Sequence, residues 1–209
     1  MKKKLLIVVF AFVVMAAAFA QTEADFEVGL TSDSTGVVIK KYTGRVAAVR
    51  IPATIQGMPV KEIGDKAFYG QGSPLDGPTN CYAITSVVIP TSVVKIGSAA
   101  FQCIIYTGPD ARYNPMEFRS KLTSVTLPEG LLEIGNNAFD GCPLTTITLP
   151  KSLTKIGDRA FANTNITTLV IPEGITEIER NVFRENSRLT TINFPPSLKV
   201  IGQGAFNSC

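Results

Sequence analysis

This 209-residue chain contains no histidine, and that absence limits its possible chemistry more than any motif does. Without histidine there is no His-based catalytic triad, no histidine general base and no histidine metal ligand. The sequence also lacks a Cys-x-x-Cys pair, a P-loop and a G-x-G-x-x-G fingerprint. Its acidic residues are scattered, so no paired-carboxylate site is indicated. We therefore expect no enzyme, no cofactor and no metal.

Aromatic and arginine side chains gather in two segments, and their chemistry is that of recognition. Tyrosine and arginine on loops held by a rigid scaffold are the residue types that anchor protein interfaces. The candidate partner-binding residues are Tyr69, Tyr82, Tyr106, Arg112, Tyr113 and Phe118. The alternative is that these segments only fold over the core.

The elements that must position these segments repeat every 22 residues, as the spacing of Pro128, Pro150 and Pro172 shows. Apolar residues lie six, three and one positions before each proline and alternate as in a short strand, which the proline ends. An isoleucine follows six positions later, then in most copies a glycine that permits a turn with positive φ. A phenylalanine comes eleven positions after the proline. A fixed period of this kind predicts a solenoid with one isoleucine and one phenylalanine per coil.

The full spacing, L-x-x-L-x-L-P-x-x-L-x-x-I-G-x-x-A-F-x-x-C, occurs from Leu122 to Cys142 and resembles the BspA-like (Treponema-type) leucine-rich repeats. Five copies fit without a gap between proline and phenylalanine, and a sixth runs from Ile51 to Phe68. The resemblance implies a β-rich leucine-rich-repeat solenoid with parallel short strands and short helical turns. It also implies an exported bacterial protein, often one that binds other proteins or host matrix at the surface.

The domain organisation follows from the ends of the array. Residues 1–20 are predicted to be a signal peptide, with three lysines, an apolar run from Leu5 to Phe19 that is short for a membrane span, and a cleavage site after Ala20. Residues 21–50 are predicted to be an N-terminal β cap, a small meander that covers Phe68. Residues 51–209 carry six repeats, with insertions near 69–80 and 104–119 that leave consecutive coils at the same point.

Charge argues against nucleic acid as a partner. The chain has 20 Lys and Arg against 17 Asp and Glu, and removal of the signal leaves 17 of each. A neutral mature chain lacks the excess of positive charge with which proteins usually bind the phosphates of nucleic acid.

Two sets of surface rows are predicted. Outward strand positions form threonine-rich rows, whose ordinary role is sheet stability, the alternative being a flat hydroxyl array that binds ice or a polysaccharide. The positions before the isoleucine alternate in sign, as do those after the proline; the first row is Lys95, Glu133, Lys155 and Glu177, and the second is Glu129, Lys151 and Glu173. We expect these charges to set the register of the coils.

The four cysteines fall into two pairs. In the resembling family, the position of Cys142 and Cys209 holds a small buried apolar filler, and these two lie too many coils apart to bridge. Cys81 and Cys103 lie beside the insertions and are a candidate disulfide in an exported protein. Because the sequence stops at Cys209, directly after the pair Ala205 and Phe206, we expect a longer array in the whole protein.

The sequence thus predicts an exported leucine-rich-repeat module that binds other proteins without covalent chemistry, adhesin-like at a cell surface, secreted or periplasmic. The alternative is a structural envelope or matrix protein that self-associates through its repeat surfaces.

Overall fold

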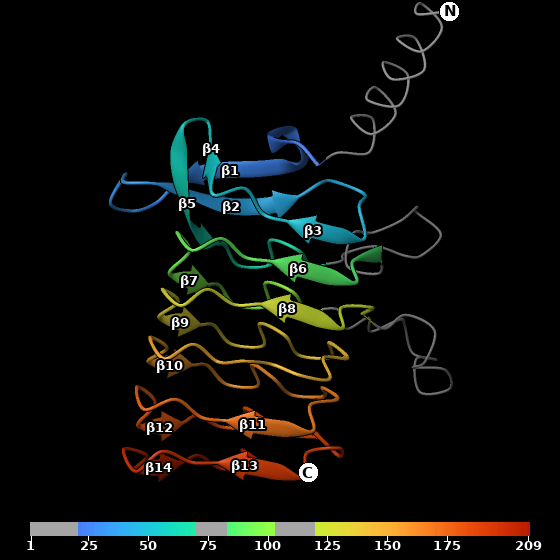
Figure 1. Ribbon diagram of the computed structural model, residues 1–209, viewed down its shortest axis with the longest axis vertical. Helices are drawn as coiled ribbons and strands as arrows, with labels where there is room; N and C mark the ends of the chain where they lie inside the picture. Colours follow the sequence, from blue (N-terminus) through green and yellow to red (C-terminus); the bar gives the residue numbers. More distant parts are fainter. Residues whose placement is uncertain (1–20, 70–82, 103–119) are drawn as a thin grey trace, which may run out of the picture.

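The computed structural model describes residues 21–69, 83–102 and 120–209. They wind into an elongated stack of coils, with the N-terminal residues at one end and Cys209 at the other (Figure 1). Within these three ranges, no helix combines the length and the apolar character needed to cross a membrane.

One side of the stack, which we call the strand face, carries a short strand from most coils. Its strands are β3 (Ala48–Arg50), β6 (Ser86–Val88), β8 (Ser124–Thr126), β11 (Thr168–Val170) and β13 (Thr191–Asn193). The first three pair in parallel, and β11 pairs in parallel with β13. The central residue of a strand, such as Val87 or Leu169, is buried. Its neighbours face outward, as the two-residue period of a strand requires.

A second side, the charged edge, carries another row of parallel strands. They are β5 (Met58–Ile63), β7 (Lys95–Ile96), β9 (Glu133–Ile134), β10 (Lys155–Ile156), β12 (Glu177–Ile178) and β14 (Val200–Ile201). Pairing runs without a gap from β5 to β10, and β12 pairs with β14.

The N-terminal residues extend the charged edge by a hairpin. After a 3-10 turn (η1, Glu23–Asp25), β1 (Phe26–Leu30) pairs antiparallel with β2 (Val37–Tyr42), and β2 pairs in parallel with β5. The short strand β4 (Thr54–Ile55) also pairs with β5. The predicted strands are present, but they form no single meander, because β3 joins β6 on the strand face.

The third side is built on a column of aromatic rings, and we call it the phenylalanine side. Neighbouring ring centroids lie 4.7–5.8 Å apart along Phe26, Tyr42, Phe68, Phe101, Phe139, Phe161, Phe183 and Phe206. The isoleucines of the charged edge form a second column, with Ile63, Ile96 and Ile134 in register. The prediction of one isoleucine and one phenylalanine per coil is therefore confirmed, and the hairpin adds Phe26 and Tyr42 to the ring column.

The glycines after the isoleucines have a different role from the one predicted. The left-handed residue of each turn lies two positions before the phenylalanine, with φ of 53–69° at Lys66, Ala99, Asn137, Arg159, Asn181 and Gly204. The glycine after each isoleucine is not left-handed. It is needed for close approach, since a Cβ at Gly135 would lie 2.7 Å from the carbonyl carbon of Gly97 in the preceding coil.

Two further expectations differ from the structure. From Gly135 to Cys142 the chain makes a series of four-residue turns, each closed by a bond from one amide to the carbonyl three residues earlier, such as Asp140 N to Asn137 O. The predicted short helical turns are therefore not confirmed. The strand predicted before Pro150 does not form either, although Ile147 is buried and Thr146 and Thr148 are exposed as its pattern requires. That coil keeps the burial pattern without the backbone pairing.

Candidate partner-binding surface

Of the predicted partner-binding residues, only Tyr69 lies in the described part of the chain. It is half-buried, and the ammonium of Lys66 lies 5.8 Å from the centroid of its ring. The others, Tyr82, Tyr106, Arg112, Tyr113 and Phe118, lie outside the described residues, as do Cys81 and Cys103.

The residues that flank the two insertions are described, and they lie on adjacent coils. Tyr69 follows Phe68, and Gln102 follows Phe101; these two rings have the shortest separation in the column, 4.7 Å. The amide of Phe68 donates to the carbonyl of Ala100 at 2.8 Å. Where the chain re-enters the stack after each insertion, the amide of Thr123 donates to the carbonyl of Thr85 at 3.0 Å. Both insertions therefore begin and end on neighbouring, hydrogen-bonded coils.

A buried carboxylate lies at the base of the second insertion, and no motif or spacing in the sequence predicted it. Asp140 is 1 % exposed, and its oxygens accept bonds of 3.3–3.4 Å from Gln102, Arg159 and Asn163. Burial raises the pKa of this carboxyl, and the Arg159 guanidinium opposes the rise. The four groups come from three coils, so the network ties Gln102, the last described residue before the insertion, to the coils that follow.

The two described cysteines are free thiols. Cys142 is fully buried, and its Sγ donates to the carbonyl of Phe101 at 3.2 Å; burial raises its pKa to about 12. This agrees with the predicted role of a small buried filler. For Cys209 the prediction of a buried filler is wrong: it lies exposed in the last described coil, and its Sγ donates to the carbonyl of Phe183 at 3.1 Å. Neither arrangement produces a reactive thiolate at neutral pH.

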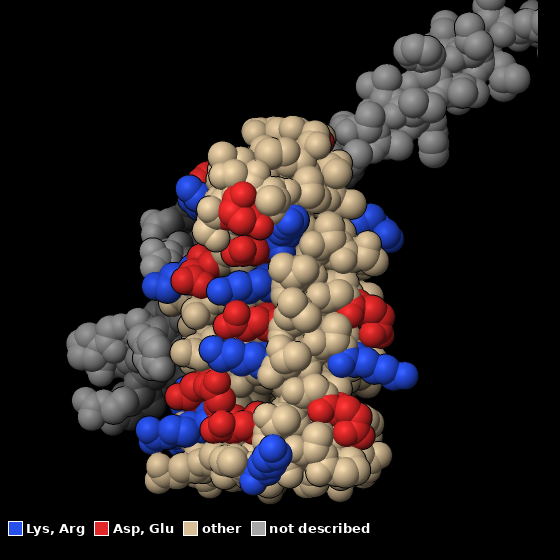
Figure 2. Space-filling model, turned by 90° about the vertical axis from the view of Figure 1, so that its left-hand side faces the viewer, with Lys and Arg blue, Asp and Glu red and all other residues tan. Residues whose placement is uncertain are grey.

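Acidic and basic side chains alternate down the charged edge (Figure 2). Glu133 pairs with both Lys95 and Lys155, each at 3.5 Å, and strand register places these three residues in one row. Glu62 extends the row beside Lys95, a member that the sequence reasoning missed because extra residues precede it. Among the described residues, Glu177 has no ion-pair partner, and the same is true of the second row, Glu129, Lys151 and Glu173. The predicted ladder is thus confirmed in part.

The first threonine row of the strand face consists of Thr85, Thr123, Thr145, Thr167 and Thr190, and three of its five hydroxyls bond to the backbone. The hydroxyls of Thr85, Thr123 and Thr190 donate to carbonyls of the preceding coil at 3.1–3.3 Å. These contacts favour sheet stability over a free hydroxyl array.

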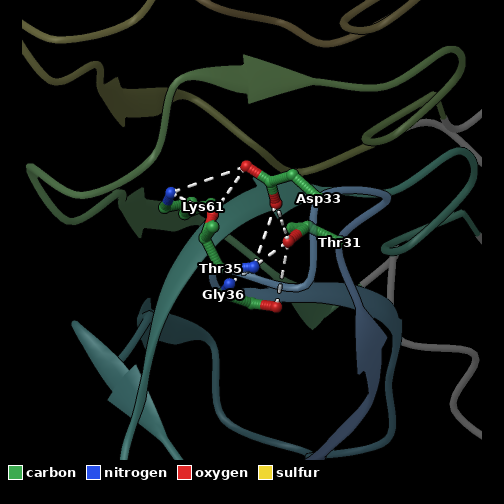
Figure 3. A network of polar contacts seen from close by, with 5 residues as sticks. All are labelled: Thr31, Asp33, Thr35, Gly36 and Lys61. Atoms are coloured by element: carbon green, nitrogen blue, oxygen red, sulfur yellow. Dashed lines mark hydrogen bonds and ion pairs between the residues drawn. The ribbon is translucent and has the colours of Figure 1, made fainter.

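A polar cluster holds the N-terminal hairpin to β5 (Figure 3). Asp33 accepts bonds of 2.6 Å from the hydroxyls of Thr31 and Thr35, and its carboxylate lies 3.9 Å from Lys61 Nζ. The hydrogen bonds from Thr31 and Thr35 hold the pKa of Asp33 well below its usual range, with Lys61 adding to the effect. Lys61 also donates to the hydroxyl of Thr35. The polar groups of this cluster bond to one another, so we interpret it as a structural turn and not as a binding site.

The described residues contain no group of three or more His, Cys, Asp or Glu side chains placed to hold a metal ion. The described residues form a parallel β solenoid, and both insertions begin and end on adjacent coils of it. This architecture is that of a solenoid repeat protein, which presents loops on a stack of similar coils.

The model of the BspA type leucine-rich repeat region matches the chain in six copies, over residues 78–107 and 116–209. The chain belongs to this family, as the spacing of its repeats predicted. No curated protein matches it.

Three solved structures show similar folds. The leucine-rich repeat protein of T. pallidum is 28% identical, with a TM-score of 0.64, over 90% of this chain and 88% of that one. A leucine-rich repeat protein from Bacteroides ovatus is 27% identical, with a TM-score of 0.70, over 91% of this chain and 45% of that one. A leucine-rich cell surface protein from Faecalibacterium prausnitzii is 29% identical, with a TM-score of 0.68, over 91% and 52%. The chain thus spans about half the length of the last two.

Proposed function

We propose that the chain is an exported protein-binding module that acts at or near a bacterial cell surface, adhesin-like, by non-covalent recognition of other proteins. Its binding site is the pair of insertions near 69–80 and 104–119. The observation that carries this proposal is the placement of their flanking residues, Tyr69 and Gln102, on adjacent, hydrogen-bonded coils. Two loops that leave one edge side by side present a single surface to a partner.

Composition supports the same site. Tyr82, Tyr106 and Tyr113, together with Arg112 and Phe118, are the residue types enriched at interface hot spots. A disulfide between Cys81 and Cys103 would restrict both insertions and lower the entropic cost of binding. A host matrix or cell-surface protein is the partner class that fits an exported module of this type.

Export is supported by residues 1–20, which have the composition of a signal peptide. It is also supported by the similarity to a protein described as a cell surface protein. Residues 21–50 serve as the cap of the stack: Tyr42 stacks on Phe68 at 5.2 Å, and Phe26 covers Tyr42. A solenoid needs such a cap because its first coil otherwise exposes an apolar face.

The experiment compares the mature chain from Gln21 with a variant in which both insertions are shortened to turns. Both are tested for binding to immobilised matrix proteins and to cells, and circular dichroism checks that the variant is folded. A matched control carries Thr148→Ala and Thr168→Ala on the strand face. We expect binding by the intact chain and the control, and none by the shortened variant.

Equal binding by the shortened variant would move the site to the scaffold. Loss of binding in the strand-face control would place it on the threonine rows. Concentration-dependent assembly of the intact chain, without binding to any surface, would favour the structural role in an envelope or matrix.

A further inference from the structure

Along the charged edge, one backbone contact recurs from coil to coil. Where a glycine follows the isoleucine, its amide donates to the isoleucine carbonyl of the preceding coil. This bond is 2.8 Å at Gly135 to Ile96, 2.8 Å at Gly157 to Ile134 and 2.7 Å at Gly202 to Ile178. A Cβ at Gly202 would lie 2.7 Å from the backbone of Glu179, closer than real Cβ atoms come. The bond therefore depends on the absence of a side chain at this position.

Glu179 is the member of this column that has a side chain. A Cβ at the glycines of this column would meet the backbone of the preceding coil, and from the repeat position of Glu179 we infer that its Cβ keeps the coil from approaching as closely as its neighbours do. No backbone hydrogen bond joins Glu179 to Ile156, and none joins Thr176 to Thr154, although both coils are described throughout. The strands β10 and β12 accordingly fail to pair, and the sheet is interrupted there.

The side chains show the same interruption. Asn136 Oδ1 accepts a bond of 3.1 Å from the amide of Asp158 in the next coil. Asp158 Oδ1 occupies the corresponding place one coil later, yet it is buried without a hydrogen-bond partner. Lys155 pairs with Glu133, and no ion pair joins it to Glu177 on the other side. The strand pairing and the ion pair that join other coils along the charged edge are thus missing at this boundary, whereas the Arg159 amide, in the turn that follows this edge, still donates to the Arg180 carbonyl at 3.2 Å.

On the phenylalanine side the same two coils remain joined. The amide of Phe161 donates to the carbonyl of Val182 at 3.0 Å, and that of Asn163 to Arg184 at 2.9 Å. Asn186, which is fully buried, strengthens this side. Its amide group donates to the carbonyls of Phe161 at 2.8 Å and Phe183 at 2.7 Å, and its Oδ1 accepts from the amide and hydroxyl of Thr164.

The ring column adapts to the wider spacing. Phe161 and Phe183 are 5.8 Å apart, the largest separation in it. On the strand face, residues 144–149 also form no strand with either neighbour. Strand pairing is thus interrupted on two of the three sides at this level, although the Asn165 amide still donates to the Leu144 carbonyl at 2.9 Å.

We propose that this boundary is a hinge. The Asn186 cluster and the ring column form its axis, and the Cβ of Glu179 keeps its charged edge open. Opening and closing would change the direction of the coils from 166 to 209 relative to those that carry the insertions. Lys155 lies at the moving edge, between Glu133 and Glu177, where it can exchange one carboxylate for the other. The hinge is independent of whether the insertions bind a partner.

Amide hydrogen exchange on the mature chain tests the proposal. In the wild type, we expect the amides of Thr176 and Glu179 to exchange at least about tenfold faster than their counterparts Leu132 and Gly135, whose bonds are intact. Glu179→Gly removes the Cβ, so it should slow exchange at position 176 about tenfold. Glu179→Ala keeps the Cβ and removes the carboxylate, so it should leave exchange as in the wild type.

The opposite change provides a second arm. Gly135→Ala should open an intact boundary and speed exchange of Leu132, without effect on Gly202. Equal protection of Thr176 and Leu132 in the wild type would overturn the hinge, and this comparison requires no variant. Slowing by Glu179→Ala equal to that by Glu179→Gly would also overturn it, because the carboxylate would then be the cause.

Discussion

The phenylalanine side and the charged edge of the solenoid are built from the same coils, but only the first is continuous. Ring contacts run from Phe26 to Phe206 without a break, whereas strand pairing on the charged edge stops between β10 and β12. Aromatic pairs remain favourable over centroid separations of about 4.5–7 Å. A backbone hydrogen bond weakens within a few tenths of an ångström. The difference teaches that side-chain stacking absorbs a local change in coil spacing that backbone pairing cannot.

Removing a ring should therefore damage the stack most. Phe161→Ala leaves a cavity at a fully buried position, and we expect it to lower the free energy of unfolding by about 3–5 kcal/mol. Phe206→Ala should cost clearly less, because that ring is half-buried. Urea denaturation measures both. Equal losses at the two positions would contradict the ring column as the main source of stability.

The Asn186 cluster should come next. Asn186→Ala leaves the Thr164 amide and the Phe161 carbonyl buried without a partner, at a cost of about 1–3 kcal/mol. Ser187→Ala, at an exposed neighbour, is the matched control and should change stability little. Thermal unfolding followed by circular dichroism measures the pair. An unchanged melting temperature in Asn186→Ala would show that the phenylalanine side does not depend on this cluster.

The charged row should have a smaller effect. Lys155→Glu removes the pair with Glu133 and places like charges together, at a cost of roughly 0.2–1 kcal/mol. The control is Lys151→Glu, at an exposed lysine without an ion pair. The difference between the two should shrink in about 1 M salt, where screening is strong. Equal destabilisation by both changes, at low and at high salt, would contradict the hypothesis that this row of charges sets the register of the coils.

Two carboxyls should give opposite dependences on pH. The pKa of Asp33 is lowered by folding, so its contribution to stability is present above its unfolded pKa of 3.8 and is lost as the pH falls below that value. The pKa of Asp140 is raised, so its contribution is present below 3.8 and is lost as the pH rises through its folded pKa.

Unfolding free energies of Asp33→Asn and Asp140→Asn across pH 2–7 measure this contrast. The first variant should lose less stability than the wild type on acidification. The second should lose less as the pH rises above 4. If both variants showed the same change of unfolding free energy with pH as the wild type, the lowered pKa of Asp33 and the raised pKa of Asp140 would be contradicted.

Much of the fold could be predicted because the repeat constrains it. The period places Phe139 and Phe161 in one column and Ile134 and Ile156 in another, and the structure confirms both. The exception at Glu179 was visible as a missing glycine, but its consequence depends on how closely the coils approach. That distance is set by backbone packing, which the residue pattern does not contain.

The polar contacts were harder to predict for a related reason. Asn186 occupies the repeat position of Cys142, so the pattern predicts a small apolar residue there. Asp140 lies outside the fixed positions of the repeat and contacts Gln102 and Arg159 from other coils. The candidate partner-binding residues stay a prediction, since all of them except Tyr69 lie outside the described residues.

The most direct test of the broken edge is scalar coupling across hydrogen bonds, measured by NMR on the deuterated mature chain. We expect couplings from the amide nitrogens of Gly135 and Gly157 to the carbonyl carbons of Ile96 and Ile134, where the bonds are 2.8 Å. On the phenylalanine side, Phe161 and Val182 should show one as well. No coupling should join Glu179 to Ile156. A coupling there of the same size as at Gly157 would contradict the account, because the charged edge would then be as continuous as the column of rings.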